Sequence, residues 1–398
     1  MILSLPMLAG CSESNLLRPY GKDDGKAPAP VSDVTVTSLP GSVVLKYKLP
    51  DDSDLSYVKA EFTGTDGSKR EAKASSYVDS LLIEGFGDTR DYLIQLKAYD
   101  KFENASSPVT IKATPLTPPV QTVFESLGWE VDFGGFAVSF KNGTKSNIGI
   151  YVTRKDSVTG VMEYYDVYFT EKADGVYAVR GLPDVENEFG IYVQDHWGNK
   201  SETMTFTTTP LREDELDKKL FSAVSPGLVN GDLQSNQYYK GSPYNFWDGT
   251  ISTFNYVHTI WPLEFPHRFS VDLGVTARLS RIKTWQRSAE DTRWQHGAWK
   301  QFNVYGCTEL PGFSSDPLEG WTLLGSFLSV KPSGLPQGQV SDEDLELLAS
   351  GEEFSFRRDV PAVRYIRFEV NKVHSEMKLS CMSEMTLWGQ IESDSSEK

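Results

Sequence analysis

The segment Asp-Lys-Phe-Glu-Asn-Ala-Ser at residues 100–106 recurs as Asp-His-Trp-Gly-Asn-Lys-Ser at residues 195–201, which is 95 positions further along the chain. The register continues without a gap to residues 115–116 and 210–211, which are Pro-Leu in both copies. Upstream of both copies, apolar and polar residues alternate in the same phase, as they do in half-buried strands. The pattern therefore predicts two related β modules, each with an Asp-x-aromatic-x-Asn turn into its last strand.

The length of the repeat indicates the type of module. A unit of about 95 residues with several short strands has the size of an immunoglobulin or fibronectin type III sandwich. Residues 31–50 alternate apolar and polar positions and lead into a Pro-Asp-Asp-Ser-Asp turn, and they resemble the first strands of a fibronectin type III domain. We expect a fibronectin type III-like sandwich over residues 31–115 and a second, related β-sandwich over residues 116–211, with both modules serving as spacers.

The composition of the 398 residues predicts an all-β protein. Short β-branched and aromatic runs alternate with Gly, Pro, Asn and Asp, and only residues 213–221 carry a convincing helical pattern. The 55 acidic residues outnumber the 39 Lys and Arg residues and give a net charge of −16. This charge repels phosphate backbones, so nucleic acid is not expected as a partner.

The first residues resemble a processing signal rather than part of a fold. Residues 1–11 begin with an apolar run that is too short to span a bilayer, and they end in Leu-Ala-Gly-Cys, which resembles the bacterial lipoprotein cleavage box. The resemblance implies that Cys11 becomes a lipidated N-terminus and that this lipid anchor is the only contact with a membrane. The alternative is a buried or disordered cysteine. Residues 12–30 are rich in Ser, Lys, Asp, Gly and Pro and are predicted to form a flexible tether.

The other two cysteines, Cys307 and Cys381, both belong to the last part of the chain. In an exported protein they could pair as a disulfide, or both could be small buried residues. The sequence leaves both alternatives open, because it does not give the separation of the two side chains.

Large aromatic side chains concentrate in residues 212–398, which hold seven of the nine tryptophans and four of the five histidines. An indole ring stacks on the apolar face of a pyranose, while arginine and histidine hydrogen-bond its hydroxyl groups. We therefore predict a sugar site built from side chains of the densest stretch, namely Arg287, Trp294, His296 and Trp299. The alternative is that tryptophans of this part, such as Trp285, Trp299 and Trp388, pack in a core.

Several short motifs follow one another in the same part of the chain. They are Asn-Phe-Trp-Asp-Gly-Thr at 245–250, Phe-Ser-Val-Asp-Leu-Gly at 269–274, and further pieces at 302–306, 363–370 and 383–389. Together they resemble the discoidin domain, the coagulation factor 5/8 C-type fold that is shared with galactose-binding-like carbohydrate modules. The resemblance implies a jelly-roll sandwich over residues 212–398 with ligand-binding loops at one end.

The same resemblance implies a structural calcium ion near the Asp-Gly loop. Carried over by motif, its oxygen ligands would come from Asp248, Thr250, Thr253 and Glu384, and hard oxygen donors of this kind suit calcium. The family pattern often has an acid or Asn after Asp-Gly, whereas this chain has Thr250. The alternative is that Asp248 only stabilises a turn.

With the cleavage box and the two sandwiches, the whole chain resembles the surface lipoproteins of Bacteroidetes polysaccharide-utilisation systems. The resemblance implies an outer-membrane, lipid-anchored protein that faces the cell exterior and captures a glycan or polysaccharide for partner glycosidases and a transporter. One alternative is an adhesin or assembly module that grips a protein partner with the same loops, and another is a structural spacer. A glycan site needs an exposed ring beside hydrogen-bonding groups, whereas a protein interface needs a broader apolar patch.

Catalysis finds no support in the motifs. The three modules take up the chain, and it contains no Gly-x-Ser-x-Gly elbow, His-Glu-x-x-His pair or phosphate loop. The acidic runs at 290–291 and 342–344 are typical of solvated loops. We therefore expect a non-catalytic protein.

Overall fold

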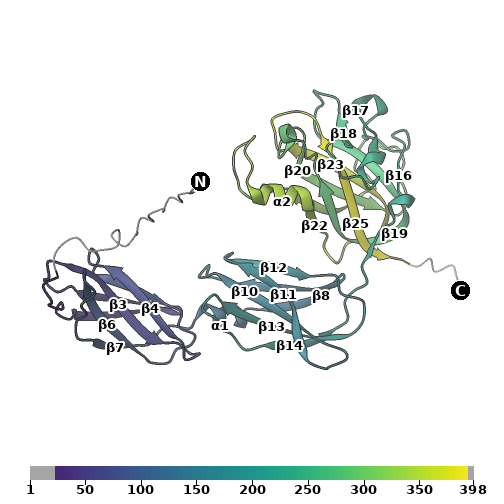
Figure 1. The fold of residues 1–398 in the computed structure, drawn as a ribbon. Coiled ribbons are helices and arrows are strands. Elements are labelled where there is room, and N and C mark those ends of the chain that lie inside the picture. Colours follow the sequence, from purple (N-terminus) through teal and green to yellow (C-terminus); the bar gives the residue numbers. More distant parts are fainter. Residues whose placement is uncertain (1–22, 393–398) are drawn as a thin grey trace, which may run out of the picture. The chain divides into compact units, whose positions relative to one another are not determined.

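The computed structural model describes residues 23–392, so the cleavage box and Cys11 lie outside the described residues. The described chain consists mainly of antiparallel strands in six sheets, with two short α-helices (Figure 1). The predicted all-β fold class is therefore confirmed. Between residues 23 and 392, no helix is both long and apolar enough to cross a membrane. The described residues divide into two compact units, one with residues 23–129, 138–177 and 187–208, and one with residues 130–137, 178–186 and 209–392.

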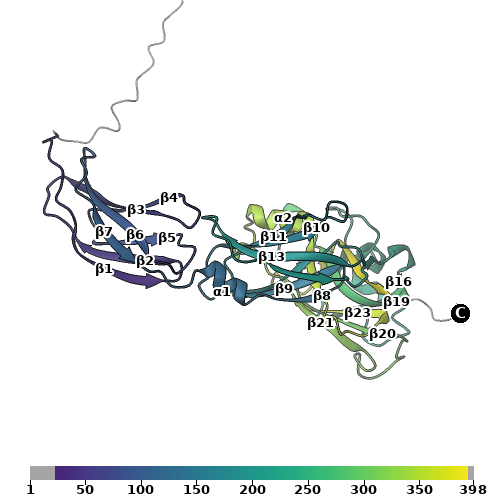
Figure 2. The same ribbon diagram turned by 90° about the horizontal axis from the view of Figure 1, so that it is seen from below.

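The first module is a sandwich of two sheets, which Figure 2 shows as separate layers. One sheet has the order β1 (Ser32–Leu39), β2 (Ser42–Lys48), β5 (Ser80–Glu84). The other has the order β4 (Lys69–Ser75), β3 (Leu55–Thr63), β6 (Tyr92–Asp100), β7 (Val109–Ala113). Apolar side chains alternate with polar ones along these strands, so Leu45, Ile83 and Ile94 are buried between the sheets.

The second module repeats this arrangement after a short helix, α1 (Pro119–Glu125). One sheet has the order β8 (Gly128–Asp132), β9 (Gly135–Lys141), β12 (Asp174–Val179). The other has the order β11 (Met162–Thr170), β10 (Ile148–Lys155), β13 (Asn187–Asp195), β14 (Met204–Thr208). Both sheets match those of the first module strand for strand, which confirms the repeat that the sequence predicts.

The repeated turn is the same in both modules at the level of single hydrogen bonds. In the first module, Oδ1 of Asp100 accepts hydrogen bonds from the backbone N–H of Phe102 at 2.8 Å and of Asn104 at 2.9 Å. In the second module, Oδ1 of Asp195 accepts hydrogen bonds from the backbone N–H of Trp197 at 3.0 Å and of Asn199 at 2.9 Å. In both copies the asparagine side chain donates to the other carboxylate oxygen at 2.8 Å. One aspartate therefore closes each turn.

The last module is built on an eight-stranded sheet around the long strand β19 (His267–Trp285). The sheet has the order β15 (Asp214–Glu215), β25 (Glu384–Ile391), β19, β23 (Val363–Val373), β20 (Trp299–Cys307), β21 (Thr322–Leu328), and β16 (Ser222–Ala223) and β22 (Glu352–Ser355) also pair with β19. A small sheet has the order β17 (Tyr238–Lys240), β18 (Val257–Thr259), β24 (Cys381–Met382). Short 3-10 turns cover Lys218–Leu220, Ser235–Gln237, Pro243–Phe246 and Glu290–Thr292. The apolar core of this module includes Val271, Leu273, Ile366 and Phe368.

Two sequence predictions about local structure are wrong. Residues 213–221 form no α-helix, because residues 214–215 pair with β25 and only Lys218–Leu220 make a 3-10 turn. The acidic run at 342–344 is the first turn of α2 (Asp342–Ser350) rather than a solvated loop. Asp344 is fully buried, and its carboxylate accepts from the N–H of Ser341 at 3.0 Å, so the run contains half of a capping box.

Cys307 and Cys381 are free thiols, the first half-buried and the second buried, so they do not form the disulfide that the sequence leaves open. Burial raises the pKa of Cys307 to about 11 and that of Cys381 to about 12. Both thiols are therefore protonated at neutral pH, which makes them poor nucleophiles.

Candidate functional site

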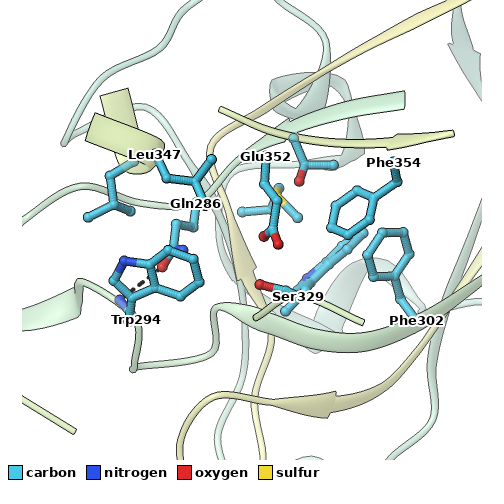
Figure 3. Close-up of a pocket in the computed structure, with 11 residues that line it drawn as sticks. Gln286, Trp294, Phe302, Ser329, Leu347, Glu352 and Phe354 are labelled. Carbon is cyan, nitrogen blue, oxygen red and sulfur yellow. Dashed lines mark hydrogen bonds between the residues drawn. The ribbon is translucent and has the colours of Figure 1, made fainter. Parts of the chain in front are cut away.

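Trp294 and Trp299 are core residues of the last module, with exposed fractions of only 2% and 5%. The Trp299 ring lies 5.4 Å from the Phe302 ring and has further phenylalanine rings around it. Nε1 of Trp294 donates to the carbonyl oxygen of Asp344 at 3.4 Å, and the indole lines a small enclosed cavity (Figure 3). The prediction that these two rings form a stacking platform is therefore wrong, because core packing leaves neither ring an open face.

Arg287 and His296, the other two predicted residues, lie together with two that the prediction missed, Tyr256 and His258. The Nε2 atoms of His258 and His296 are 3.1 Å apart. The guanidinium carbon of Arg287 lies 4.2 Å from the centre of the Tyr256 ring, and the rings of Tyr256 and His258 are 6.4 Å apart. We call these four residues the histidine–arginine cluster.

The small sheet and one loop position the cluster. His258 in β18 pairs with Cys381 in β24, and the N–H of Cys381 donates to the carbonyl of Gly297 at 2.8 Å, directly beside His296. Trp294 and His296 both have left-handed backbone, with φ of 54° and 48°. Residues other than glycine uncommonly adopt this conformation, and such positions concentrate at functional sites. Because of this backbone, the side chains of Trp294 and His296 do not share one face as they would on a regular strand. The Trp294 ring packs in the core, whereas the His296 ring contacts His258.

The hydrogen bonds define the protonation of the two imidazoles. Nδ1 of His258 lies 2.5 Å from the carbonyl oxygen of Thr259, which only accepts, so this nitrogen carries the proton. Burial, with a further contribution from the charge of Arg287, lowers the pKa of both histidines from 6.5. Neutral His258 therefore accepts at Nε2 from His296, which leaves Nδ1 of His296 as a lone-pair acceptor. Nε of Arg287 donates to the carbonyl of Thr253 at 3.2 Å. Within residues 23–392 its terminal N–H groups have no hydrogen-bond acceptor, so they can donate to a ligand.

One exposed ring lies against the cluster, and a second belongs to the residue that follows Thr253. Tyr239 is 75% exposed, and its ring lies 5.5 Å from that of His258. It faces outward because successive residues of β17 point to opposite sides. Phe254 is 80% exposed and directly follows Thr253, the residue whose carbonyl holds Arg287. The cluster therefore has the exposed ring of Tyr239 beside its hydrogen-bonding groups, and this ring is not one of the tryptophans that the sequence singles out.

Glu384, the carboxylate among the predicted calcium ligands that is most deeply buried, already has protein partners on both oxygens. Oε1 accepts from Nζ of Lys218 at 2.9 Å. Oε2 accepts from the backbone N–H of Gly249 at 2.7 Å and of Thr250 at 3.1 Å. Burial raises the pKa of Glu384, and the ammonium of Lys218 opposes that shift. A lysine thus supplies the positive charge beside this carboxylate.

The other predicted calcium ligands also form hydrogen bonds within the protein. Oδ1 and Oδ2 of Asp248 each lie 2.8 Å from Nδ2 of Asn255, and Oδ1 accepts from the N–H of Thr250 at 2.9 Å, as expected of a turn residue. The carbonyl of Thr253 accepts from Arg287. Calcium needs about six to eight oxygens, whereas the carboxylates of Asp248 and Glu384 already have protein hydrogen-bond partners on all four oxygens. Calcium at this loop stays a prediction, and the structure shows how the protein satisfies both carboxylates on its own.

We expect the melting temperature of the protein to be the same in excess EDTA and in millimolar calcium chloride, because Lys218 already neutralises Glu384. Scanning calorimetry of metal-free protein measures this. Lys218→Met leaves the buried carboxylate without its counter-charge and should lower the melting temperature, whereas Lys219→Met, at an exposed neighbour, should not. A calcium-dependent rise in the melting temperature of the wild type would contradict this interpretation.

Three family models, each described as a domain of unknown function, match the chain: DUF4959 at residues 28–115, DUF5126 at residues 116–219 and DUF5000 at residues 247–389. None of the curated proteins matches it. Among solved structures, a SusE-like protein is 32% identical over 69% of this chain and 100% of that chain, with a TM-score of 0.45. The chain belongs to the SusE-like family.

Its SusE-like relative confirms the predicted resemblance to proteins of polysaccharide-utilisation systems. The SusE-like chain is also similar to a family 32 CBM from Clostridium perfringens in complex with galactose, with 14% identity, coverage of 44% of this chain and 98% of that chain, and a TM-score of 0.29. A segment of two fibronectin type III domains from chicken tenascin is 17% identical and covers 45% of this chain and 99% of that chain, with a TM-score of 0.22.

Proposed function

We propose that this SusE-like chain is a non-catalytic glycan-binding protein and that the histidine–arginine cluster, with the exposed rings of Tyr239 and Phe254, contacts the glycan. The observation that carries the proposal is the exposed Tyr239 ring beside a pair of histidines that keeps a hydrogen-bond acceptor for a ligand. A protein interface would instead require a broad apolar patch.

The chemistry of the cluster matches that of a sugar. Each hydroxyl of a pyranose both donates and accepts, so it can accept from the terminal N–H groups of Arg287 and donate to Nδ1 of His296. Because the pKa of His296 is lowered, its ring is neutral at pH 7 and keeps this acceptor. The apolar C–H face of the sugar can then stack on Tyr239 or Phe254.

The cellular setting is part of the same proposal. A lipid on Cys11 would hold the chain at the outer membrane, facing the cell exterior, with residues 12–30 as the tether before the first sandwich. The captured polysaccharide would pass to partner glycosidases and a transporter. The cleavage-box resemblance and membership of the SusE-like family support this assignment.

The test is to titrate the purified chain with a panel of soluble polysaccharides by calorimetry. Arg287→Met keeps the aliphatic stem but removes the donors, and it should weaken binding about tenfold or more, because hydrogen bonds of charged groups contribute about 1.5–3 kcal/mol. Tyr239→Ala should weaken binding to a similar extent through the loss of ring stacking. Arg357→Met is the matched control, because the Arg357 side chain is 80% exposed and lies outside the cluster.

Melting curves recorded in parallel separate lost binding from lost folding. If folded Arg287→Met and Tyr239→Ala both keep the wild-type affinity, the glycan contact lies elsewhere. If no glycan binds the wild type, the protein-binding alternative takes precedence.

A further inference from the structure

The loop that places His296 in the histidine–arginine cluster also places Trp294 at a separate pocket of about 340 Å³. The pocket lies between the start of β20, the end of β21 with the loop that follows, and the residue after β23. The polar side chains that line it are Lys300, Ser329, Lys331, Gln337 and His374. Its rim includes the aliphatic side chains of Leu328 and Val330, which are 53% and 60% exposed. This volume and mixed lining suit a small organic ligand such as one sugar unit.

The two lysines of the pocket differ in their surroundings. Nζ of Lys331 donates to the carbonyls of Leu335 at 3.1 Å and Pro336 at 3.2 Å, and it lies 3.8 Å from Oδ2 of Asp344. Lys331 therefore organises the loop that forms one wall, and Asp344 offsets its charge. Among residues 23–392, no carboxylate lies within ion-pair distance of Lys300. The charge of Lys300 is thus left for a ligand.

His374 is buried close to both lysines of the pocket. Burial, followed by the charges of Lys300 and Lys331, lowers the pKa of His374 to about 4. The nearby carboxylate of Glu352 belongs to the enclosed cavity of Figure 3, where it lies between Trp294 and Phe354. It accepts from the N–H of Val330 at 3.3 Å, and burial raises its pKa to about 6. Asp344 and Glu352 thus stand against one of the two lysine charges, and the ammonium of Lys300 is the charge in this pocket that has no carboxylate partner among residues 23–392.

The serine and histidine of the pocket do not form a hydrolytic pair. Oγ of Ser329 lies 2.9 Å from Nε2 of His374, but Ser329 is only 2% exposed. The carboxylate of Glu352 hydrogen-bonds to Ser329. In a catalytic triad the acid would instead hydrogen-bond to the ring nitrogen of the histidine that does not contact the serine, which here is Nδ1 of His374. Ser329 and His374 satisfy each other, and Lys300 is the group that can bind an anion.

We propose that this pocket binds an acidic sugar, with the carboxylate or sulfate of the sugar paired to the ammonium of Lys300 and the sugar ring against the aliphatic rim. Charge-assisted hydrogen bonds of this kind are roughly twice as strong as neutral ones. The inference goes beyond the proposed function, because it specifies an anionic ligand and because none of these residues belongs to the histidine–arginine cluster. Two contacts on one charged polymer would raise its avidity.

The test is a calorimetric titration of the full chain at low ionic strength with D-glucuronate, glucose 6-sulfate and glucose. One or both of the acidic sugars should bind at least about tenfold more tightly than glucose, and added salt should reduce that difference. Lys300→Gln should lose about tenfold or more of the affinity for the acidic sugars. Lys300→Arg should retain it, and so should Lys219→Gln, a matched control at an exposed lysine outside the pocket.

The outcomes are distinct. Binding of only one acidic sugar through Lys300 supports the inference and identifies the anionic group. No binding of either acidic sugar, equal affinity for glucose, or unchanged affinity in folded Lys300→Gln overturns it. Arg287→Met should leave glucuronate binding intact. If Arg287→Met removes it and Lys300→Gln does not, the acidic sugar occupies the histidine–arginine cluster, so this inference fails while the proposed function stands.

Discussion

Replacement of Trp299 by alanine is expected to destabilise the last module by about 3–5 kcal/mol. The ring is 5% exposed and lies 5.4 Å from the Phe302 ring, 5.7 Å from that of Phe368 and 5.9 Å from that of Phe246. Its Nε1 has no hydrogen-bond partner in the described part of the chain, so the stabilisation comes from apolar burial and ring packing. Alanine would leave a cavity among these phenylalanines, because sheet-borne side chains relax only partly into such a space.

Urea unfolding of the wild type and of Trp299→Ala measures this loss. Phe313→Ala is the control, because Phe313 is 70% exposed and its removal should change the free energy of unfolding by no more than about 0.5 kcal/mol. A Trp299→Ala protein with wild-type stability and no affinity for glycan would contradict the core role and make this ring a ligand contact after all.

Replacement of Asp232 by alanine is expected to cost about 3–5 kcal/mol, because it leaves the charge of Arg367 buried without its partner. The side chains of Arg367 and Asp232 are 1% and 2% exposed, and Nη2 lies 3.2 Å from Oδ1. This contact is an ion pair without the alignment of a hydrogen bond. Nε of Arg367 donates to Oγ of Ser270 at 3.0 Å, and the guanidinium lies 4.4 Å from the centre of the Trp321 ring. These neutral contacts hold the guanidinium in place but do not balance its charge.

A double-mutant cycle isolates the pair. Asp232→Ala and Arg367→Met should each be strongly destabilising, while the double variant should cost clearly less than the sum, since it removes both charges together. Denaturant unfolding of the four proteins gives the coupling free energy. Additive losses would show that the two charges do not depend on each other and would contradict the paired interpretation.

The architecture of the first two modules is readable from the sequence because it depends on short-range chemistry. Asp100 closes its turn with N–H groups two and four residues away, so the residues that make the turn are also neighbours in the sequence. The alternation of apolar and polar residues in the flanking strands is equally local. The acidic run at 342–344 is an exception. Its charge pattern predicts a solvated loop, but the folded chain buries Asp344.

The sequence predicts the candidate site only in part. Composition directs attention to the stretch from Trp285 to Trp299, and Arg287 and His296 do lie near each other there. Composition does not determine which of these side chains face solvent. Left-handed backbone at Trp294 and His296 turns one ring into the core and the other toward His258, which belongs to a different strand. The short run Tyr-Tyr-Lys at 238–240 holds the exposed Tyr239, and alternation on a strand was the signal that could have found it.

Charge compensation within the last module is decided by tertiary contacts alone. A motif resemblance assigns Glu384 to calcium, but folding brings Lys218 from far away in the sequence to within 2.9 Å of its carboxylate. Likewise, Arg287 reaches the carbonyl of Thr253, which the same motif assigns to the metal. Local sequence predicts turns and strands, because these depend on neighbouring residues. Burial of a ring and neutralisation of a carboxylate depend on groups that meet only when distant strands pack, since desolvation makes each buried charge require a partner in space.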